Sequence, residues 1–600
     1  MVVTEVLWAL LALRMFAGGA RVGAALRRLP AASADGDGEG FVSVLGPAAR
    51  PSEDQLRRAA AWADQHDVDV LHLVPERCTV GYAWMAGFVL DRAQRRDDWL
   101  EAKEATGWAT LIRRDALERS ALDVPARLDD GAALIALQKK LARYGRSAVA
   151  IAPDAGLQGP DPFTDRAGLE EALNADQALV VGPPMMIGLL LAGPWLAPWA
   201  GSVALILYLL QQIVALGRGP LTVPAAALVF SPVIRLPWQI GRWLRCVVAP
   251  SRRLRRAEAE ALRPVYAELL EGGVERFFDP RRSTCPLCEG GDLRRALSTV
   301  DLWQGKPGRF TLDECAGCGH LFQNPRLSLQ GLDFYYRDFY DGLGGEDLET
   351  LFASSAQPYA ERAGAVLAHG QPERWLDVGC GHGHFCARGR ELLPDCRFEG
   401  LDLSDSVLDA ERRGWLDAAH RGLFPDLAEG LAGSFDAVSM SHYLEHTTDP
   451  RAEMAAAARV LEPGGHLLIE VPNPESTIGR LLGGWWLPWF QPQHLNILPP
   501  ALITKELQAA GFDVVLEQLS ECHQPLDLLA AVTLMFRRVM PLPDRPWRPP
   551  TSTAARVLRP VVGVAGLGIW LLAAATDLLL QPLTRRPGWS NTYRVLARRR

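Results

Sequence analysis

The chain has 600 residues, more than one hydrophobic core usually serves, so two to four domains are expected. Its formal net charge is -7, whereas nucleic-acid-binding proteins usually carry a basic excess, so the composition argues against a nucleic-acid partner. The mean hydropathy of +0.01 is high for a chain with 22% charged residues, which indicates strongly apolar segments beside ordinary soluble ones. Ten cysteines are too few for a disulfide scaffold, and four of them form two Cys-x-x-Cys pairs.

Residues 1–30 are predicted to form a membrane anchor. Residues 2–13 are apolar apart from Thr4 and Glu5, and a helix must continue past Arg14 to cross about 30 Å of hydrocarbon. The positive charges follow the apolar run instead of preceding it. This order favours an uncleaved anchor over a signal peptide and predicts that the next domain lies in the cytoplasm.

The following region, residues 41–182, is expected to be a smaller α/β domain. Two β-type runs, 41–45 and 68–74, flank a charged helical stretch at 52–66, and residues 148–152 form another predicted strand. A strand–helix–strand order is typical of a parallel sheet.

The first of these strands and the Gly46-Pro47 that follows resemble the opening of membrane-bound family 2 glycosyltransferases, which also place membrane helices after the catalytic domain. Such enzymes need an Asp-x-Asp-like cluster to hold a divalent metal and a nucleotide diphosphate. The corresponding segment here, residues 73–78, reads Leu-Val-Pro-Glu-Arg-Cys, and the acidic groups at Asp91 and at 97–98 are typical of solvated helix faces. The sequence therefore favours a degenerate, non-catalytic domain.

Residues 183–240 are predicted to contain membrane-embedded helices. No charged side chain occurs in residues 185–216, and about 20 apolar residues suffice to cross a bilayer. Pro194 and Pro198 could divide the run into two half-helices, and a second apolar run spans 221–234. A hairpin that returns to the cytoplasm is the simplest topology, and a buried core helix is the alternative.

A basic, helical connector at 241–280 leads to a cysteine-rich module at 281–330. Two Cys-x-x-Cys turns can bring four thiolates into the tetrahedron of a closed structural zinc site. Gly319, directly after the second pair, suits a rubredoxin-like knuckle. The module is therefore predicted to be a zinc ribbon, and its mixed charge does not suit nucleic acid. The predicted metal ligands are Cys285, Cys288, Cys315 and Cys318.

A glycine-rich turn between a strand and a helix occupies residues 374–385. Residues without a Cβ let the backbone approach a ligand, and a helix N-terminus offers free N–H groups. A second predicted strand, 398–404, carries Asp402, which would accept both ribose hydroxyl protons in a doubly wound sheet. Asp377 beside the turn would repel a pyrophosphate but suits a ligand with an ammonium and a sulfonium. The predicted cofactor-binding residues are Asp377, Gly379, Cys380, Gly381, Gly383 and Asp402.

With these residues the sequence resembles the class I S-adenosylmethionine-dependent methyltransferases. The resemblance continues in order through 434–440 as the family's fourth strand, 460–470 as the turn into the fifth, and 507–512 as the approach to the sixth. It implies S-adenosylmethionine as cofactor, with Asp377 and the three glycines around the methionine portion and Asp402 at the ribose. The family's adenine-contacting acidic residue has no counterpart in 421–424, and another Rossmann-like protein is the alternative.

The segment that follows the cysteine-rich module carries a second resemblance. Residues 321–326 and the aromatic runs 334–336 and 339–340 resemble the junction in methyltransferases with an N-terminal zinc ribbon, several of which act on sugars. In those enzymes the ribbon helps to form the acceptor side. The methyltransferase domain is thus predicted over 331–600, with an apolar segment at 560–583 that lies at a membrane interface.

Candidate catalytic groups follow the predicted fourth strand. A sulfonium leaving group is already activated, so methyl transfer needs a positioned nucleophile, and a base helps when the acceptor is a hydroxyl or a carbon acid. His446 and His494 are the candidate bases, and Glu445 and Tyr443 are polar options. Alternatively, the Glu-His pair only orders a loop over the cofactor. The tryptophan-rich segment 484–490 could line an acceptor pocket, stack on a sugar or lie at a membrane interface.

The expected architecture is α/β, with a Rossmann-like doubly wound sheet preceded by a zinc ribbon, membrane helices and a smaller N-terminal α/β domain. The sequence predicts a methyltransferase at the inner membrane, with its catalytic domain in the cytoplasm, that acts on a sugar or lipid-linked acceptor. A bifunctional glycosyltransferase–methyltransferase is the enzymatic alternative, and a membrane scaffold with a dead methyltransferase fold is the non-enzymatic one. The methylated atom and the oligomeric state are left open.

Overall fold

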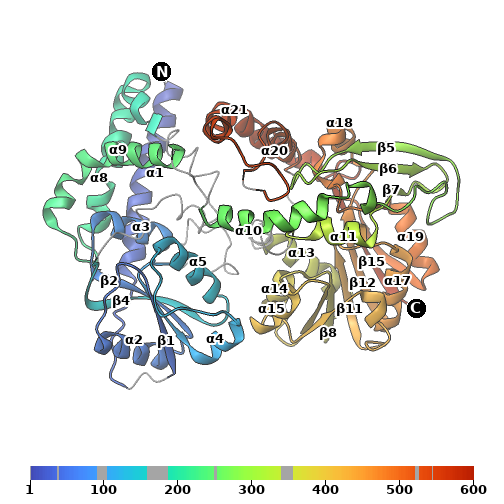
Figure 1. The fold of residues 1–600 in the computed structure, drawn as a ribbon, viewed down its shortest axis with the longest axis horizontal. Helices are drawn as coiled ribbons and strands as arrows, with labels where there is room; N and C mark the ends of the chain where they lie inside the picture. The colour runs from blue at the N-terminus through green and yellow to red at the C-terminus, as the bar shows by residue number, and fades with distance from the viewer. Residues whose placement is uncertain are drawn as a thin grey trace. The chain divides into compact units, whose positions relative to one another are not determined.

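The computed structural model describes nine stretches of the chain, which form two compact units, Met1–Leu254 and Arg255–Arg600 (Figure 1). The described stretches are residues 2–36, 40–90, 105–158, 187–188, 190–248, 253–339, 356–520, 526–543 and 545–600. The acidic candidates at 91–98 lie outside the described residues.

The N-terminal unit contains a four-stranded mixed sheet in the order β1-β3-β2-β4. β3 is antiparallel to both β1 and β2, whereas β2 and β4 are parallel. The three strands predicted from the sequence, β1, β2 and β4, therefore run in the same direction. The sheet is nevertheless mixed, because the antiparallel strand β3, which the sequence did not predict, lies between β1 and β2. The strands are β1 (Phe41–Leu45), β2 (Val70–Arg77), β3 (Ala109–Arg113) and β4 (Ser147–Gly156).

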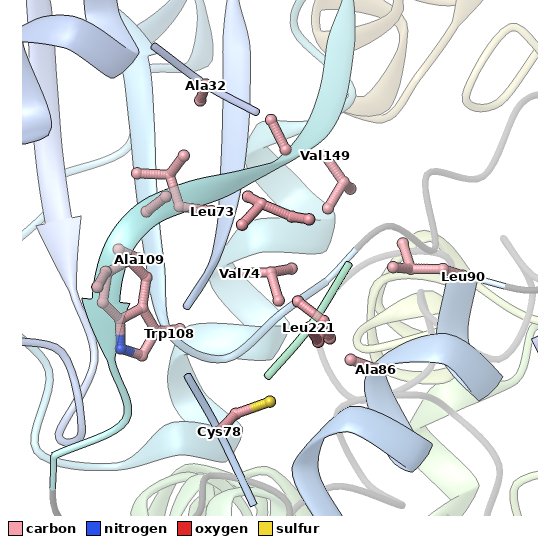
Figure 2. Packing of buried hydrophobic residues seen from close by; sticks show 14 of the residues in the cluster. Ala32, Leu73, Val74, Cys78, Ala86, Leu90, Trp108, Ala109, Val149 and Leu221 are labelled. Atoms are coloured by element: carbon pink, nitrogen blue, oxygen red, sulfur yellow. The ribbon is translucent and has the colours of Figure 1, made fainter. Parts of the chain in front are cut away.

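Local signals explain the helices around this sheet. α2 (Glu53–Gln65) begins with a capping box, in which the Ser52 hydroxyl accepts from the Gln55 N–H and the Gln55 side chain accepts from the Ser52 N–H. Figure 2 shows part of the buried apolar core of this unit, which includes Leu73 and Val74 of β2 and the Trp108 ring. The other helices here are α3 (Val80–Leu90), α4 (Arg114–Ser120) and α5 (Gly131–Leu141).

Three apolar helices, α1 (Val2–Arg27), α8 (Pro198–Leu216) and α9 (Ala225–Val248), belong to the same unit. Trp8–Arg27 and Pro198–Leu216 are long and apolar enough to cross a membrane, but core helices of soluble proteins can meet the same criteria. α8 begins at Pro198 after a bend at Ala197, as the predicted division at the prolines requires.

The C-terminal unit is built on a seven-stranded sheet in the order β10-β9-β8-β11-β12-β15-β14. The strands from β10 to β12 are parallel, and β15 is antiparallel to both of its neighbours. This doubly wound order, with a topological switch between β8 and β11, agrees with the expected Rossmann-like fold. The strands are β8 (Arg374–Val378), β9 (Arg397–Asp402), β10 (Ala418–Arg421), β11 (Phe435–Ser441), β12 (Leu461–Pro472), β14 (Phe512–Gln518) and β15 (Thr592–Arg599).

Helices cover both faces of this sheet. Alternate residues of β8 point to opposite faces, so Trp375 packs in the core beneath α13, α14 and α15 while Leu376 packs in the core beneath α17 and α19. These helices are α13 (Ala356–Leu367), α14 (His384–Leu392), α15 (Ser406–Arg412), α17 (Pro450–Val460) and α19 (Pro500–Ala509).

A second, four-stranded sheet in the order β13-β7-β6-β5 contains the cysteine-rich module. Three strands come from the module, but β13 comes from the middle of the methyltransferase half, so the module does not stand alone. Its strands are β5 (Leu293–Thr299), β6 (Phe310–Cys315), β7 (Leu321–Gln323) and β13 (Asn496–Ile497).

Four further helices belong to the C-terminal unit or lead into it, and in Figure 1 two of them, α20 and α21, lie side by side. α21 includes the apolar segment that was predicted at 560–583. These helices are α10 (Arg253–Leu270), α11 (Leu329–Tyr336), α20 (Asp527–Val539) and α21 (Thr553–Thr584).

Candidate active site

The glycine-rich turn lies between β8 and α14, at the carboxyl edge of the large sheet. Gly379, Gly381 and Gly383 all have left-handed φ angles, of 72°, 53° and 73°. A Cβ on Gly379 would lie 2.5 Å from the Tyr443 ring, and one on Gly383 would lie 2.9 Å from Ala410. A Cβ on Gly381 would meet no atom within 4 Å. Two of the glycines therefore allow close packing, and the third borders open space.

Asp402 forms the rim of this space, at the end of β9. Its Oδ2 accepts a hydrogen bond from the Gly381 N–H at 2.9 Å, and its Oδ1 accepts from the N–H and the hydroxyl of Ser404 at 2.9 and 2.8 Å. The carboxylate is partly exposed and fixed against the turn. Asp402 therefore lies at the carboxyl end of β9 and beside the open face at Gly381, which is the position that the sequence predicted.

Asp377 lies beneath the turn instead of on its open side. It is buried, and its Oδ1 accepts a hydrogen bond from the Ser439 hydroxyl at 2.5 Å. Burial raises the pKa of Asp377 to about 6, although the nearby Arg362 guanidinium and the Ser439 hydrogen bond lower it. Cys380 packs close to Gly400 of β9, since a Cβ on that glycine would meet the Cys380 sulfur at 2.7 Å.

Two leucines that sequence reasoning missed lie beside this edge of the sheet. Leu403 follows Asp402 directly, and Leu423 follows β10. They are 61% and 50% exposed, which is high for large apolar side chains. The Arg421 guanidinium donates to the Leu403 carbonyl at 3.3 Å, so the two loops are adjacent. Leu403 comes directly after the end of β9, and Leu423 comes two residues after the end of β10. A large apolar residue just after a parallel strand is the sequence signal that could have identified them.

The segment that follows β11 crosses the glycine turn. β11 is the neighbour of β8, with Ser439 opposite Asp377, so its carboxyl end emerges beside the turn. The Tyr443 ring packs against Gly379, and its hydroxyl donates to Glu453 at 3.0 Å. Burial and the charge of Glu453 raise the pKa of Tyr443. Tyr443 thus holds the segment against the turn through its ring.

Glu445, His446 and His494 come together at the end of this segment. Their potential ligand atoms all lie within 4.8 Å of one another. Glu445 is 1% exposed, its Oε1 contacts His442 Nδ1 at 3.0 Å, and its Oε2 has no hydrogen-bond partner among the described residues. Burial acts to raise the pKa of Glu445, but the His442 hydrogen bond and the neighbouring histidines lower it to about 2. The cluster therefore contains a buried carboxylate that is ionised at neutral pH.

The two candidate bases are neutral imidazoles at neutral pH. His494 Nδ1 lies 2.7 Å from the Pro488 carbonyl, and His446 Nδ1 lies 3.1 Å from the Gln493 carbonyl. If each Nδ1 carries the proton that it donates to these carbonyls, each Nε2 keeps its lone pair. Burial lowers the pKa of His494 to about 3 and also lowers that of His446. Tyr336, which sequence reasoning did not place here, lies 2.9 Å from His446 Nδ1.

The four cysteines of the second sheet converge as predicted. The Cys285 and Cys318 sulfurs are 3.7 Å apart, those of Cys288 and Cys315 are 3.4 Å apart, and all four lie within 4.8 Å of one another. Bonds of about 2.3 Å to a tetrahedral zinc would separate the sulfurs by roughly 3.8 Å, whereas a disulfide needs about 2.05 Å. Gly319 has the left-handed φ of 74° that a knuckle turn requires.

The cysteine module and the histidine cluster are joined through residues 491–497. β13 pairs with β7, and His320 Nε2 lies 3.0 Å from the Asn496 side-chain oxygen. The Gln323 side chain donates to Gln491 at 2.9 Å. Since His494 lies in the same segment, the sheet that carries the cysteines also supports one of the candidate bases.

Comparison with known proteins agrees with this geometry. A sequence model described as "Methyltransferase domain" matches residues 352–517. A malonyl-acyl-carrier protein O-methyltransferase from Alcanivorax borkumensis is 35% identical over 162 residues, which are 25% of this chain and 54% of the relative. A ubiquinone biosynthesis O-methyltransferase from Hahella chejuensis is 30% identical over 169 residues, 26% of this chain and 68% of the relative.

The matches thus span about half to two thirds of these two relatives' own length. A solved S-adenosylmethionine-dependent methyltransferase from Archaeoglobus fulgidus is 18% identical, with 42% of this chain and 98% of that chain covered and a TM-score of 0.27. The relatives are named as enzymes, which favours an active methyltransferase over a scaffold. The chain belongs to the S-adenosylmethionine-dependent methyltransferases.

Proposed function

We propose that this protein is a membrane-associated methyltransferase that transfers a methyl group from S-adenosylmethionine to a sugar or lipid-linked glycan. The proposal rests on the proximity of the glycine turn to the cluster of Glu445, His446 and His494. The glycine turn with Asp402 borders the cofactor space, and the segment held by Tyr443 brings the Glu445–His446–His494 cluster next to it. A methyl donor and a proton acceptor would therefore face the same acceptor molecule.

The bound cofactor would supply the electrophilic methyl group on its sulfonium. Asp402 would accept hydrogen bonds from the ribose hydroxyls, and the exposed Leu403 and Leu423 would contact the adenine. Asp377 is buried beneath the turn, so its contribution would come from its charge and from fixing β8 to β11 through Ser439. The backbone at Gly381 would contact the methionine portion.

His446 would take the proton from the acceptor hydroxyl or carbon acid. Its low pKa keeps the ring neutral at the start, and the Nδ1–H that points to the Gln493 carbonyl leaves Nε2 available. The ionised Glu445 would stabilise the imidazolium that forms. His494 Nε2 lies 4.0 Å from Glu445 Oε1, and this neutral ring would help to hold Glu445 in place.

Zinc is part of the proposal as a structural ion. The spacing of the four sulfurs fits a tetrahedral site, and β13 connects this site to the segment that carries His494. A folded ribbon would therefore hold the acceptor side of the cleft in place. The ribbon resemblance to sugar methyltransferases supports a sugar as the acceptor.

Membrane association is supported by apolar side chains that face outward. Trp195, Trp199 and Val233 of the N-terminal unit are highly exposed, and Leu572 and Leu579 of α21 are exposed in the C-terminal unit. In water such surfaces would be unfavourable, whereas a bilayer would cover them. The basic residues that flank the apolar runs support an inner-membrane location with the catalytic unit in the cytoplasm.

An acceptor panel tests the function. The full chain in lipid nanodiscs is incubated with radiolabelled S-adenosylmethionine and with nucleotide sugars, polyprenyl-linked glycans or a prenylated phenol. The prenylated phenol tests a second candidate function, the O-methylation of a phenol hydroxyl. The name of the Hahella chejuensis relative, a ubiquinone biosynthesis O-methyltransferase, favours this candidate. Label in a glycan supports the proposal, and label only in the phenol or in a soluble amine contradicts it.

The role of His446 has its own test on whichever acceptor is labelled. His446→Gln should lower kcat about a hundredfold or more, as loss of a general base does, while the cofactor Kd stays unchanged. A fall in cofactor affinity with an unchanged kcat would instead favour the alternative that the Glu-His pair only orders the loop.

A further inference from the structure

A cationic cavity lies in the C-terminal unit, outside the cofactor site. It has a volume of about 340 Å³ and is formed by residues 300–308, which follow β5, and by the C-terminal end of α20 with the loop after it. Its charged lining residues are Asp301, Lys306, Arg537, Arg538 and Arg548.

The lining carries an excess of positive charge. Lys306 is 2% exposed, and its Nζ donates to the Phe334 carbonyl at 2.8 Å. Asp301 is also buried and accepts hydrogen bonds from the backbone N–H groups of Trp303, Gln304 and Lys306. Burial lowers the pKa of Lys306 to about 7, although the charge of Asp301 acts to raise it, so Lys306 adds little net positive charge beside Asp301. The three arginines remain. Arg538 and Arg548 form no salt bridge with a carboxylate in the part of the chain that the structure describes.

Two of the guanidinium groups are held in place by neutral partners. Arg537 stacks over the Trp303 ring at 4.0 Å and donates to the Trp303 carbonyl at 3.1 Å. Arg548 donates to the Gly305 carbonyl at 3.0 Å. Burial lowers the pKa of Arg548, and the charge of Arg538 lowers it further while Asp301 raises it, so the two guanidinium groups share one electrostatic environment. A guanidinium stays charged at any physiological pH, so an anion is the complementary ligand.

The cavity is connected to the candidate base by aromatic rings. The centroid of the Trp303 ring lies 5.7 Å from that of Phe490, and the Phe490 ring lies 5.3 Å from the His494 ring. An anionic group in the cavity would therefore lie along one wall that leads to the methyl-transfer site.

Exposed apolar side chains lie on α20, whose C-terminal end lines the cavity, and on the neighbouring α21. Met535 and Val539 of α20 are 40% and 72% exposed, and Val539 is the next residue after Arg538. α21, which packs beside α20, exposes Leu571 and Leu572. A ligand with a charged group and a hydrocarbon chain would contact both the cationic cavity and these apolar side chains, whereas a soluble anion would contact only the cavity.

We propose that the cavity binds the phosphate or diphosphate group of a lipid-borne acceptor, whose hydrocarbon chain lies on the exposed apolar side chains of α20 and α21. Arginine is well suited to phosphate because its planar group can donate two parallel hydrogen bonds. The inference rests on the proposed function and names the acceptor's class, a sugar carried on a lipid phosphate.

A vesicle-binding experiment tests the cavity without any methyl transfer. The full chain is floated with phosphatidylcholine vesicles that contain or lack polyprenyl phosphate. Wild-type protein should bind the phosphate-containing vesicles more tightly, and Arg538→Gln should lose about tenfold of that affinity, as expected for one charge-assisted contact. Arg309→Gln is the matched control, because Arg309 is an exposed arginine just beyond the lining segment and undergoes the same charge change. Arg309→Gln should bind like the wild type.

The double variant Arg538→Gln/Arg548→Gln should lose the preference for phosphate-containing vesicles. If the double variant fails to fold, the single variant Arg538→Gln still tests the proposal. Equal losses in Arg538→Gln and Arg309→Gln would overturn the proposal, since they would show attraction by overall charge. Inorganic pyrophosphate that binds the wild type as tightly as the lipid does would also overturn it.

Methylation assays separate this inference from the proposed function. If the wild type methylates a lipid-linked sugar with a KM that Arg538→Gln leaves unchanged, the cavity assignment fails and the proposed function stands. If no lipid-linked sugar is methylated but vesicle binding still depends on Arg538, the cavity assignment is supported and the proposed acceptor is wrong.

Discussion

Replacing Asp402 by alanine should weaken the binding of S-adenosylmethionine and leave the fold intact. The Asp402 carboxylate is partly exposed at the end of β9, so its removal creates no cavity in the core. The hydrogen bonds that would be lost within the protein are those from the Gly381 N–H and from Ser404. Both donors lie at the edge of the cleft, where water can replace the carboxylate.

The magnitude follows from the contacts that Asp402 would make. A hydrogen bond to a charged group contributes about 1.5–3 kcal/mol, and two ribose hydroxyls would donate to this carboxylate. Some of this free energy is recovered when water binds in its place, so a loss of about 2–4 kcal/mol is expected, or roughly 30-fold to 1,000-fold in Kd. The free energy of unfolding should fall by only about 1 kcal/mol.

Isothermal titration calorimetry of the full chain in detergent measures this change, and thermal unfolding followed by circular dichroism checks the fold. Asp405→Ala is the matched control, because Asp405 lies three residues further on, is exposed, and pairs with Arg421 instead of the turn. A Kd for Asp402→Ala within about threefold of the wild type, or an equal loss for Asp405→Ala, would refute the assignment of the cofactor site.

Three further predictions concern other parts of the site. Gly381→Ala should weaken cofactor binding, and its loss of stability should come only from the strain of a left-handed alanine, since its Cβ meets no protein atom. Gly379→Ala should lose more stability, because its Cβ would also lie 2.5 Å from Tyr443. Urea titrations and calorimetry on both variants would distinguish them, and equal stabilities would contradict the packing. Cys288→Ser should lower the bound zinc, measured by mass spectrometry of metals, from one equivalent, and a wild-type protein without zinc would rule out the ribbon. The pKa of His494 is about 3 in the folded protein but 6.5 in the unfolded chain, so the unfolded state binds more protons between these two pH values. The free energy of unfolding should therefore fall as the pH drops through that window, by up to about 1.4 kcal/mol per pH unit. His494→Gln should flatten this slope in urea titrations, and an unchanged slope would show that the imidazole is not buried as a neutral group.

The parts of the site that the sequence could predict are those encoded by neighbouring residues. The glycine turn needs left-handed backbone at Gly379, Gly381 and Gly383, and the spacing to Asp402 follows from one strand, one helix and a second strand. The two Cys-x-x-Cys turns are equally local. In each case a short segment specifies its own backbone, and adjacent parallel strands then bring the segments together.

The parts that could not be predicted depend on residues far apart in the chain. Tyr336 contacts His446 across 110 positions, and Asn496 contacts His320 across 176. The pairing of β13 with the cysteine module rests on only two residues, too few to produce an alternating pattern. In the N-terminal unit, β3 has only five residues and buries its first four without alternation, so its pattern does not distinguish a strand from part of a buried helix.

The position of β15 has a consequence for how the protein is made. β15 lies between β12 and β14, and its Arg594 donates to Glu470, so residues 592–599 fill the gap between two strands that are synthesised long before them. Until these residues leave the ribosome, β12 has an unpaired edge and β14 has no neighbour. The apolar helix α21 emerges earlier and could reach a lipid surface first. Closure of the catalytic sheet must therefore wait until residues 592–599 have been synthesised, and until then its open strand edges are exposed to aggregation.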